Sequence, residues 1–274
     1  MKPVLLAATV TPMREGGQAI DEDAIEPLVE YVEDGGCDGL FIAGTAGEGF
    51  LLGHEERKRV ATLFCQASKG RRLVHAGSQT TAATVDLAVH AAGLGADGVA
   101  VIPPPYYPLS DEALVAHLVT AANACSPTPF FIYAFASRSG YPLTREVVEA
   151  VGERVDNLKG MKVSEPSFER AAPFLGLGLE ILIGSDPVVP EAFEAGAAGA
   201  ASALAGVLPH EVREIIDDPG PDAADELTEL RDGLLVAGDM IPGIKAELGR
   251  RGVPVGRDVR QPLRANQREQ PTLI

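Results

Sequence analysis

Short apolar runs and longer amphipathic runs alternate along the chain, and the pattern repeats about every 30 residues. Within the apolar runs, polar positions do not alternate with apolar ones, so we expect parallel strands that are buried on both faces. Eight such strands are predicted, at residues 4–9, 39–43, 73–76, 98–102, 130–133, 160–163, 181–184 and 199–202.

The amphipathic runs between these strands have the spacing of helices that bury one face. They are predicted at residues 23–33, 54–68, 82–94, 111–124, 144–151, 167–174, 190–195 and 209–216. Eight strand–helix units in one chain of 274 residues predict an α/β fold, a closed (β/α)8 TIM barrel without free sheet edges. A doubly wound open sheet is the alternative, but no glycine-rich phosphate loop follows the first strand.

An extension follows the eighth unit. We assign residues 1–221 to the barrel and residues 222–274 to a C-terminal helical extension and tail packed on it, because two further helical runs lie within 222–250. The tail, residues 252–274, is rich in Pro, Arg and Gln, and we expect it to run over the surface or into a neighbouring subunit. No linker indicates a second domain.

Composition narrows the choice of partners. A net charge of −16 and a pI near 4.7 argue against nucleic acid or an anionic membrane, and local cations and amides must therefore hold any anionic substrate. Three widely spaced cysteines indicate a reducing compartment. The opening segment, residues 1–10, is too short for a signal peptide, and no apolar run reaches the roughly 20 residues of a membrane span. We therefore expect a cytoplasmic protein.

Lys162 is the most informative residue, because it lies at the end of the predicted strand 160–163. An amine at the end of a buried strand loses hydration, and its pKa falls toward neutrality. A neutral amine can condense with a ketone, which predicts covalent catalysis through Lys162. The alternative is that the side chain extends from the strand end to water.

Two loops at predicted carboxyl ends of strands carry further candidate groups, since catalytic residues of this fold lie there. In the loop 44–49, glycines around Thr45 allow backbone amides to converge on a carboxylate, although an ordinary glycine turn has the same composition. In the loop 103–108, prolines fix where Tyr106 and Tyr107 point, either into a site or over the barrel end.

The fifth predicted strand adds two more candidates. Tyr133 is its last residue, and a phenol there is suited to proton donation. Arg138 follows in the next loop, and its planar guanidinium is suited to binding a second carboxylate.

Taken together, these segments resemble the dihydrodipicolinate synthase / N-acetylneuraminate lyase family of class I, pyruvate-dependent aldolases. The resemblance runs from residues 9–12 to residues 252–254 and rests on the motifs Gly44-Thr45-x-Gly47-Glu48, Pro105-Tyr106-Tyr107, Tyr133 with Ser137-Arg138-Ser139-Gly140, Gly160-Met161-Lys162, and Gly184-Ser185-Asp186. It implies a lyase or synthase that acts on pyruvate or a related 2-oxo acid without a metal or organic cofactor. The positions of the histidines are consistent with a reaction that needs no metal, because only His75 is near a strand end and one histidine does not make a metal site.

The resemblance also assigns roles to individual residues. The Schiff-base lysine falls on Lys162, the acid/base tyrosine on Tyr133 and the threonine of the proton relay on Thr45. The tyrosine that completes the relay from a neighbouring subunit falls on Tyr107, which implies a homodimer or homotetramer; packing within its own barrel end is the alternative. The arginine that synthases use for the carboxylate of the aldehyde falls on Arg138.

The substrate pocket is assigned to Ala46, Arg138, Gly184 and Ala201. The amides of Thr45 and Ala46 are expected to bind the carboxylate of pyruvate. Ala46 stands where the family usually has a second threonine, and Ala201 is smaller than the branched residue often found near the end of the eighth strand. These departures reshape the pocket around an otherwise intact set of catalytic groups.

The second substrate therefore remains open. Arg138 favours condensation with, or release of, a carboxylate-bearing aldehyde. Cleavage of a 2-keto-3-deoxy sugar acid by the same family chemistry is the alternative. A non-catalytic barrel that binds a 2-oxo acid is a third possibility, but the joint retention of Lys162, Tyr133, Thr45 and Tyr107 argues against it.

Overall fold

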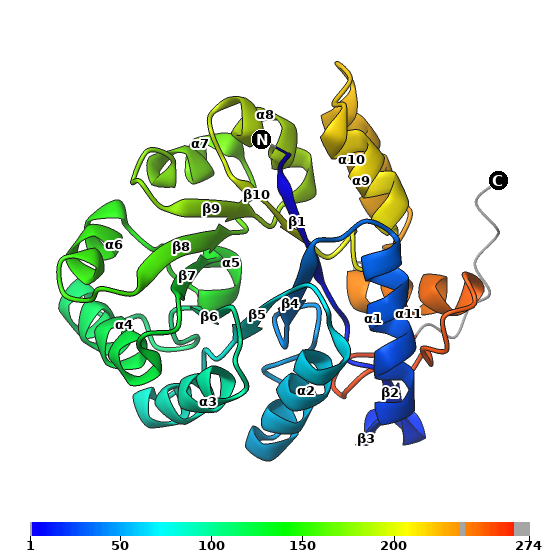
Figure 1. Cartoon of the computed structure of the whole chain (residues 1–274), viewed down its shortest axis with the longest axis horizontal. Helices are drawn as coiled ribbons and strands as arrows, with labels where there is room; N and C mark the ends of the chain where they lie inside the picture. The colour runs from blue at the N-terminus through cyan, green and yellow to red at the C-terminus, as the bar shows by residue number, and fades with distance from the viewer. Residues whose placement is uncertain (1, 236–238, 266–274) are drawn as a thin grey trace.

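Eight parallel strands close into a barrel in the computed structural model, which describes residues 2–235 and 239–265 (Figure 1). In chain order they are β1 (Val4–Ala8), β4 (Gly39–Ile42), β5 (Arg71–His75), β6 (Gly98–Val101), β7 (Phe130–Ala134), β8 (Leu158–Val163), β9 (Glu180–Ile183) and β10 (Gly199–Ser202). Each strand pairs with its neighbours in the order of the chain, and β10 and β4 both pair with β1 to complete the circle. The predicted TIM barrel is confirmed, and the open sheet is excluded.

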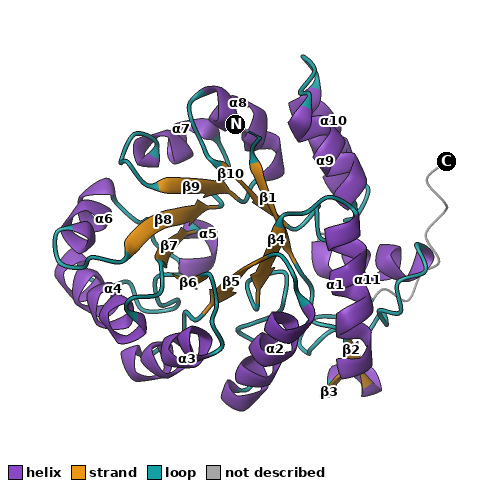
Figure 2. Ribbon diagram, in the orientation of Figure 1, coloured by secondary structure: helices purple, strands orange, loops and turns teal. Residues whose placement is uncertain are grey.

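Helices cover the outside of the barrel (Figure 2). They are α1 (Ile25–Asp34), α2 (His54–Ala67), α3 (Thr81–Gly93), α4 (Asp111–Cys125), α6 (Arg145–Gly152), α7 (Phe168–Ala171), α8 (Val189–Glu194) and α9 (Pro209–Asp217). The predicted ends hold to within two residues, except that α7 stops early and continues as a 3-10 turn, Ala172–Phe174. Thr80, Ser110 and Thr144 cap α3, α4 and α6, because each side chain accepts an amide of the first turn.

Two short elements depart from the predicted pattern. An antiparallel hairpin joins β2 (Met13–Arg14) to β3 (Ala19–Ile20), and α5 (Ala136–Ser139) follows β7. Strands of two residues and a helix of one turn are too short to give a periodic signal in the sequence. α5 lies at the carboxyl end of the barrel and carries Arg138.

Side chains fill the interior of the barrel, as is usual for this fold. Leu6, Phe41, Phe131 and Leu182 are fully buried members of one inner cluster. Gly160 makes room for this cluster, because a Cβ there would lie 2.3 Å from Phe131 Cε1. This inner cluster supports the residues that follow it at the carboxyl ends of the strands.

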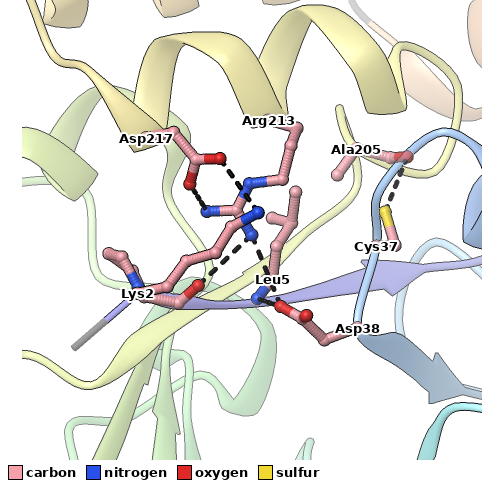
Figure 3. A network of polar contacts seen from close by, with 8 residues as sticks. Lys2, Leu5, Cys37, Asp38, Ala205, Arg213 and Asp217 are labelled. Carbon is pink, nitrogen blue, oxygen red and sulfur yellow. Dashed lines mark hydrogen bonds and ion pairs between the residues drawn. The ribbon is translucent and has the colours of Figure 1, made fainter.

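A polar network ties α9 to the amino ends of the strands (Figure 3). The Arg213 guanidinium donates to the Pro3 carbonyl at 3.2 Å and to Asp38 Oδ2 at 3.4 Å, and it also pairs with Asp217. The same Asp38 oxygen accepts the amide of Leu5 at 2.8 Å. Because Asp38 precedes β4 and Leu5 lies in β1, the network closes the barrel at the end opposite the predicted site.

Two more helices, α10 (Ala223–Asp232) and α11 (Met240–Arg250), follow the barrel, and α10 packs beside α8 and α9 (Figure 2). The segment after α11 returns to the hairpin, where the Gly16 amide donates to Asp258 Oδ2 at 2.9 Å. Residues 266–274 of the predicted tail lie outside the described residues.

The three cysteines lie in the core of the fold. Cys37, Cys65 and Cys125 are buried free thiols, and burial raises the pKa of each thiol, to about 12 for Cys37. They therefore behave as small apolar residues of the core.

Among the helices in the described part of the chain, none has the length and apolarity to cross a membrane.

Candidate active site

Lys162 lies on β8, directly opposite Tyr133 of the neighbouring strand β7. Its side chain points into the barrel mouth: Nζ lies 3.8 Å from the centroid of the Phe41 ring and 4.9 Å from that of Tyr133. Only 4% of the residue is exposed. The side chain therefore does not extend to water, and the catalytic interpretation of this lysine is the one that its position supports.

Burial lowers the pKa of Lys162 to about 7, and the nearby carboxyl of Asp186 acts in the opposite direction. A lysine in water is almost wholly protonated at neutral pH. Here a large fraction of the amine is neutral and carries the lone pair that attacks a carbonyl carbon.

The rate of adduct formation at Lys162 is expected to follow this titration. Below pH 7 the amine gains a proton and loses its lone pair, so the rate should fall about tenfold per pH unit and level off above pH 7. Single-turnover trapping of a 2-oxo acid with borohydride, sampled from pH 5 to pH 10, measures the profile. A midpoint near pH 10 would contradict the lowered pKa.

Gly184 gives the lysine its space. A Cβ at this position would lie 2.8 Å from Lys162 Cε and 2.0 Å from Ser164 Oγ. The residue follows β9, whose neighbour in the barrel is β8. The structure thus gives Gly184, a predicted pocket residue, a steric reason to lack a side chain.

Tyr133 places a phenol beside the lysine and is 2% exposed. Its hydroxyl lies 3.3 Å from Thr45 Oγ1, so the two predicted relay residues are in hydrogen-bond contact. Burial raises the pKa of Tyr133 above its ordinary value of 10, which keeps the phenol protonated at neutral pH. A protonated phenol held by a hydroxyl can give a proton to a carbonyl oxygen and take one back.

The loop that carries Thr45 is tightly folded. The amides of Glu48 and Gly49 donate to the carbonyls of Thr45 and Gly44, both at 3.1 Å. Gly49 is required there, because a Cβ would lie 2.1 Å from the Ala43 carbonyl oxygen. Within the described residues the amides of Thr45 and its neighbour at position 46 donate to no protein group, so both are free to bind a carboxylate.

Two predicted pocket positions are small residues of the inner cluster. Ala46 and Ala201 belong to the same buried cluster as Tyr133, and they are 8% and 0% exposed. Larger side chains at these positions would reduce the space around the phenol.

Nearby, Ser202 donates to the buried carboxyl of Asp186, whose pKa is raised by burial.

His75 and Arg57 form a wall of the site whose role the sequence does not reveal. The His75 ring packs edge-on against Tyr133 with centroids 5.8 Å apart, and Arg57 donates to the His75 and Gly77 carbonyls at 2.8 and 2.7 Å. Burial, and secondly the Arg57 charge, lowers the pKa of His75 well below its ordinary range. His75 is therefore a neutral packing partner of the phenol. In the sequence, only the place of His75 at the end of β5 indicates that it lies near the site.

Arg138 lies exposed at the mouth of the site on α5. Its guanidinium carbon lies 5.7 Å from the centre of the Phe135 ring, which in turn lies 5.9 Å from the Tyr133 ring. The buried carboxylate of Glu165 anchors α5 by accepting the Ala136 amide at 2.9 Å. Glu165 follows Lys162 by three residues, and only the closed barrel brings it to α5.

Tyr107 is the predicted residue that the fold does not bring to the others. It is 72% exposed and packs edge-on against Tyr106 with ring centroids 4.8 Å apart. In residues 2–235 and 239–265, no hydrogen bond joins it to Thr45 or Tyr133. Its exposure does not fit packing within its own barrel end.

Known proteins are similar to this chain in sequence and in fold. The profile of the dihydrodipicolinate synthetase family matches residues 3–273. An uncharacterised DapA-like lyase of Halobacterium salinarum is 36% identical over 267 residues, which cover 91% of this chain and 84% of that protein. A 4-hydroxy-tetrahydrodipicolinate synthase of Lactobacillus helveticus is 34% identical over 282 residues, which cover 98% of this chain and 89% of that protein.

A solved structure extends the likeness to the fold. YagE, a prophage protein of the dihydrodipicolinic acid synthase family from E. coli K12, was crystallised in complex with pyruvate. The two chains are 25% identical and superpose with a TM-score of 0.88, over 96% of this chain and 93% of that one. The similarity therefore spans almost the whole of both chains.

Proposed function

The chain belongs to the dihydrodipicolinate synthetase family and is an aldolase-type lyase, and from this premise we propose that Lys162 forms a Schiff base with pyruvate or a related 2-oxo acid. The bound acid is then joined to, or released from, a carboxylate-bearing aldehyde. The observation that carries the proposal is the buried amine with a pKa of about 7, set beside the Thr45–Tyr133 hydroxyl pair. The pyruvate complex of the related prophage protein supports the choice of substrate.

The first half of the reaction makes the imine. The free amides of residues 45 and 46 hold the carboxylate of the 2-oxo acid, and neutral Lys162 attacks C2. A carbon–nitrogen bond forms, and the carbonyl oxygen leaves as water after it takes one proton from the amine and one from Tyr133. The product is a cationic imine, which withdraws electrons from the adjacent methyl group.

The second half uses the imine as an electron sink. The Tyr133 phenolate takes a proton from the methyl group, which converts the imine into a neutral enamine. The enamine carbon attacks the aldehyde, a carbon–carbon bond forms, and the new alkoxide takes the proton back from Tyr133. Water then hydrolyses the imine, and the same steps in reverse cleave a longer 2-oxo acid.

We propose further that Tyr107 acts in the site of a partner subunit. The relay within one chain ends at Thr45, and Tyr107 is exposed on a loop at the same end of the barrel. An added phenol would connect Thr45 to bulk water and complete the path for protons. A homodimer is then the smallest unit with a complete relay.

The acceptor is expected to depend on Arg138. Replacing Arg138 with alanine should raise KM for a carboxylate-bearing aldehyde by about 10- to 100-fold, because a charge-assisted hydrogen bond of the guanidinium is lost. Steady-state assays with pyruvate and matched aldehydes, with and without a carboxylate, measure the effect. Trapping of pyruvate at Lys162 should not change, because Arg138 is exposed on α5 whereas Lys162 is buried on β8.

Arg145→Ala is the matched control, since it removes an exposed arginine that pairs with Glu149 within α6, the helix after α5. Equal losses for charged and neutral aldehydes in the Arg138 variant would overturn this part of the proposal. Such a result, together with activity on polyhydroxylated aldehydes, would favour a 2-keto-3-deoxy sugar-acid aldolase. The small side chains of Ala46 and Ala201 are the observation that supports this second candidate. Binding of a 2-oxo acid without turnover of any aldehyde would leave the non-catalytic barrel.

A further inference from the structure

A buried ion pair connects the C-terminal extension to the loop that carries Thr45. Lys245 of α11 donates to Glu48 Oε1 at 2.6 Å, and neither side chain is exposed to solvent. The two residues are 197 positions apart in the chain. Burial lowers the pKa of Lys245, and the Glu48 carboxylate opposes this shift.

Both charged groups make a second bond, and each of these reaches the segment after α11. Glu48 Oε2 accepts the amide of Arg260 at 2.6 Å, and Lys245 Nζ also donates to the Asp258 carbonyl at 2.7 Å. Glu48 therefore uses both of its oxygens. An ion pair of this kind does not by itself stabilise a fold more than apolar residues would, because both charges must be desolvated. Its geometry suggests a different role.

The pair holds a strained part of the catalytic loop. Glu48 has a φ of +57° and Ala43 a φ of +55°, and both lie in the left-handed region that residues with a side chain rarely adopt. Such residues persist only where the surroundings hold them, and they cluster at functional sites. Glu48 closes the turn whose first residue is Thr45, so a displacement of Glu48 moves Thr45.

The extension also fixes the far end of the loop. The Arg260 guanidinium donates to Glu56 Oε1 at 2.6 Å, and the other oxygen of Glu56 accepts the Gly53 amide at 2.7 Å, at the start of α2. The loop is thus tied to residues 258–260 at Glu48 and again just before α2. Thr45 lies three residues before the first of these anchors, and the Glu48 amide, which donates to the Thr45 carbonyl, passes the constraint on to it.

We propose that Glu48, Lys245 and residues 258–260 form a clamp that positions Thr45 against Tyr133, so that the C-terminal extension is part of the catalytic unit. The members of the clamp are positioning residues, because they act on the reacting atoms only through the loop. The proposal rests on the proposed function, in which Thr45 and Tyr133 transfer protons. Borohydride trapping counts the imine at its end point, which a slowed relay still reaches, whereas the rate of methyl-proton exchange measures the relay itself.

The test separates these two steps in the full-length chain. Lys245→Met and Glu48→Gln are each compared with the wild type by borohydride trapping of pyruvate and by exchange of pyruvate methyl protons in deuterium oxide, followed by NMR. We expect both variants to trap pyruvate on Lys162, and we expect Lys245→Met to exchange protons about 100-fold more slowly per trapped site, as for a small misplacement of a catalytic group. The milder Glu48→Gln should lose about tenfold, because glutamine keeps the shape and part of the bonding.

Two comparisons exclude a merely structural role. Glu180→Gln breaks the ion pair with Arg71 at the amino ends of the strands, away from Thr45, and it should exchange at the wild-type rate per folded site. The double variant should lose no more than Lys245→Met alone, because residues of one unit are not additive. All rates are taken at a temperature where circular dichroism shows each variant folded.

The outcomes distinguish the clamp from the function on which it rests. A wild-type chain that traps neither pyruvate nor any short 2-oxo acid overturns the proposed function and the clamp with it. A wild type that traps pyruvate, with clamp variants that exchange protons at the wild-type rate per trapped site, overturns the clamp alone. Multiplied losses in the double variant would likewise contradict it.

Discussion

Replacing Lys162 with alanine is expected to abolish covalent capture of pyruvate and to lower aldol turnover by about 10⁴-fold or more. Among the described residues, the other buried lysine is Lys245, and its amine is paired with Glu48. The barrel should still fold, because the change also removes a buried amine whose desolvation opposes folding. Steady-state turnover and borohydride trapping of the variant measure both effects.

Lys159→Ala is the matched control for this experiment. Lys159 lies on the same strand and is exposed, and among the described residues its amine donates to the Asp156 carbonyl alone, so its loss should leave turnover unchanged. A Lys162→Ala chain that keeps more than a tenth of wild-type turnover would show that the imine forms elsewhere or that the reaction does not pass through one.

Replacing Tyr133 with phenylalanine should have the second largest effect, a loss of about 10²- to 10⁴-fold in turnover. The ring keeps its packing against Phe41 and His75, while the hydroxyl that contacts Thr45 disappears. Proton exchange at the pyruvate methyl group should fall by the same factor. Thr45→Val should cause a smaller loss of the same kind, because it removes the partner of the phenol.

Tyr31→Phe provides the comparison for the loss of a partly buried phenol. The Tyr31 hydroxyl on α1 donates to the Val207 carbonyl at 2.9 Å, which is remote from the lysine. Turnover in this variant should stay within twofold of the wild type. If Tyr133→Phe exchanged methyl protons as fast as Tyr31→Phe, Tyr133 would not be the acid and base of the reaction.

The barrel is predictable because its signal is local and repeated. Most strands contain a short apolar run, and the strand of residues 199–202 is predicted with both ends correct. Each helix that is capped by Thr80, Ser110 or Thr144 begins one residue later. Once eight such units close, Lys162 and Tyr133 must meet, since both lie at carboxyl ends of adjacent strands.

The supporting residues could not be predicted, because their partners are remote in the chain. Glu165 reads as a polar loop residue until the barrel brings it to the Ala136 amide. Lys245 lies in an amphipathic helical run, and nothing near it in the sequence identifies Glu48 as its counter-ion. The family motif includes Glu48, but the motif gives no reason for the carboxylate.

Tyr107 marks another limit of prediction from one chain. Its predicted role rests on the resemblance alone, and in a single barrel the residue is 72% exposed. Within the described residues, the ring packs against Tyr106 and no hydrogen bond joins it to Thr45 or Tyr133. The assignment of Tyr107 to a partner's site therefore stays a proposal, and it has to be tested on the oligomer.

The central claim is that Lys162 forms an imine with a 2-oxo acid, and one measurement tests it most directly. The protein is incubated with pyruvate, reduced with borohydride, digested and mapped by mass spectrometry. The predicted result is one reduced pyruvyl adduct per chain, on Lys162 and not on Lys245, the other lysine that is buried in the described part of the chain. An unmodified Lys162 after reduction with pyruvate and with other short 2-oxo acids would contradict the account.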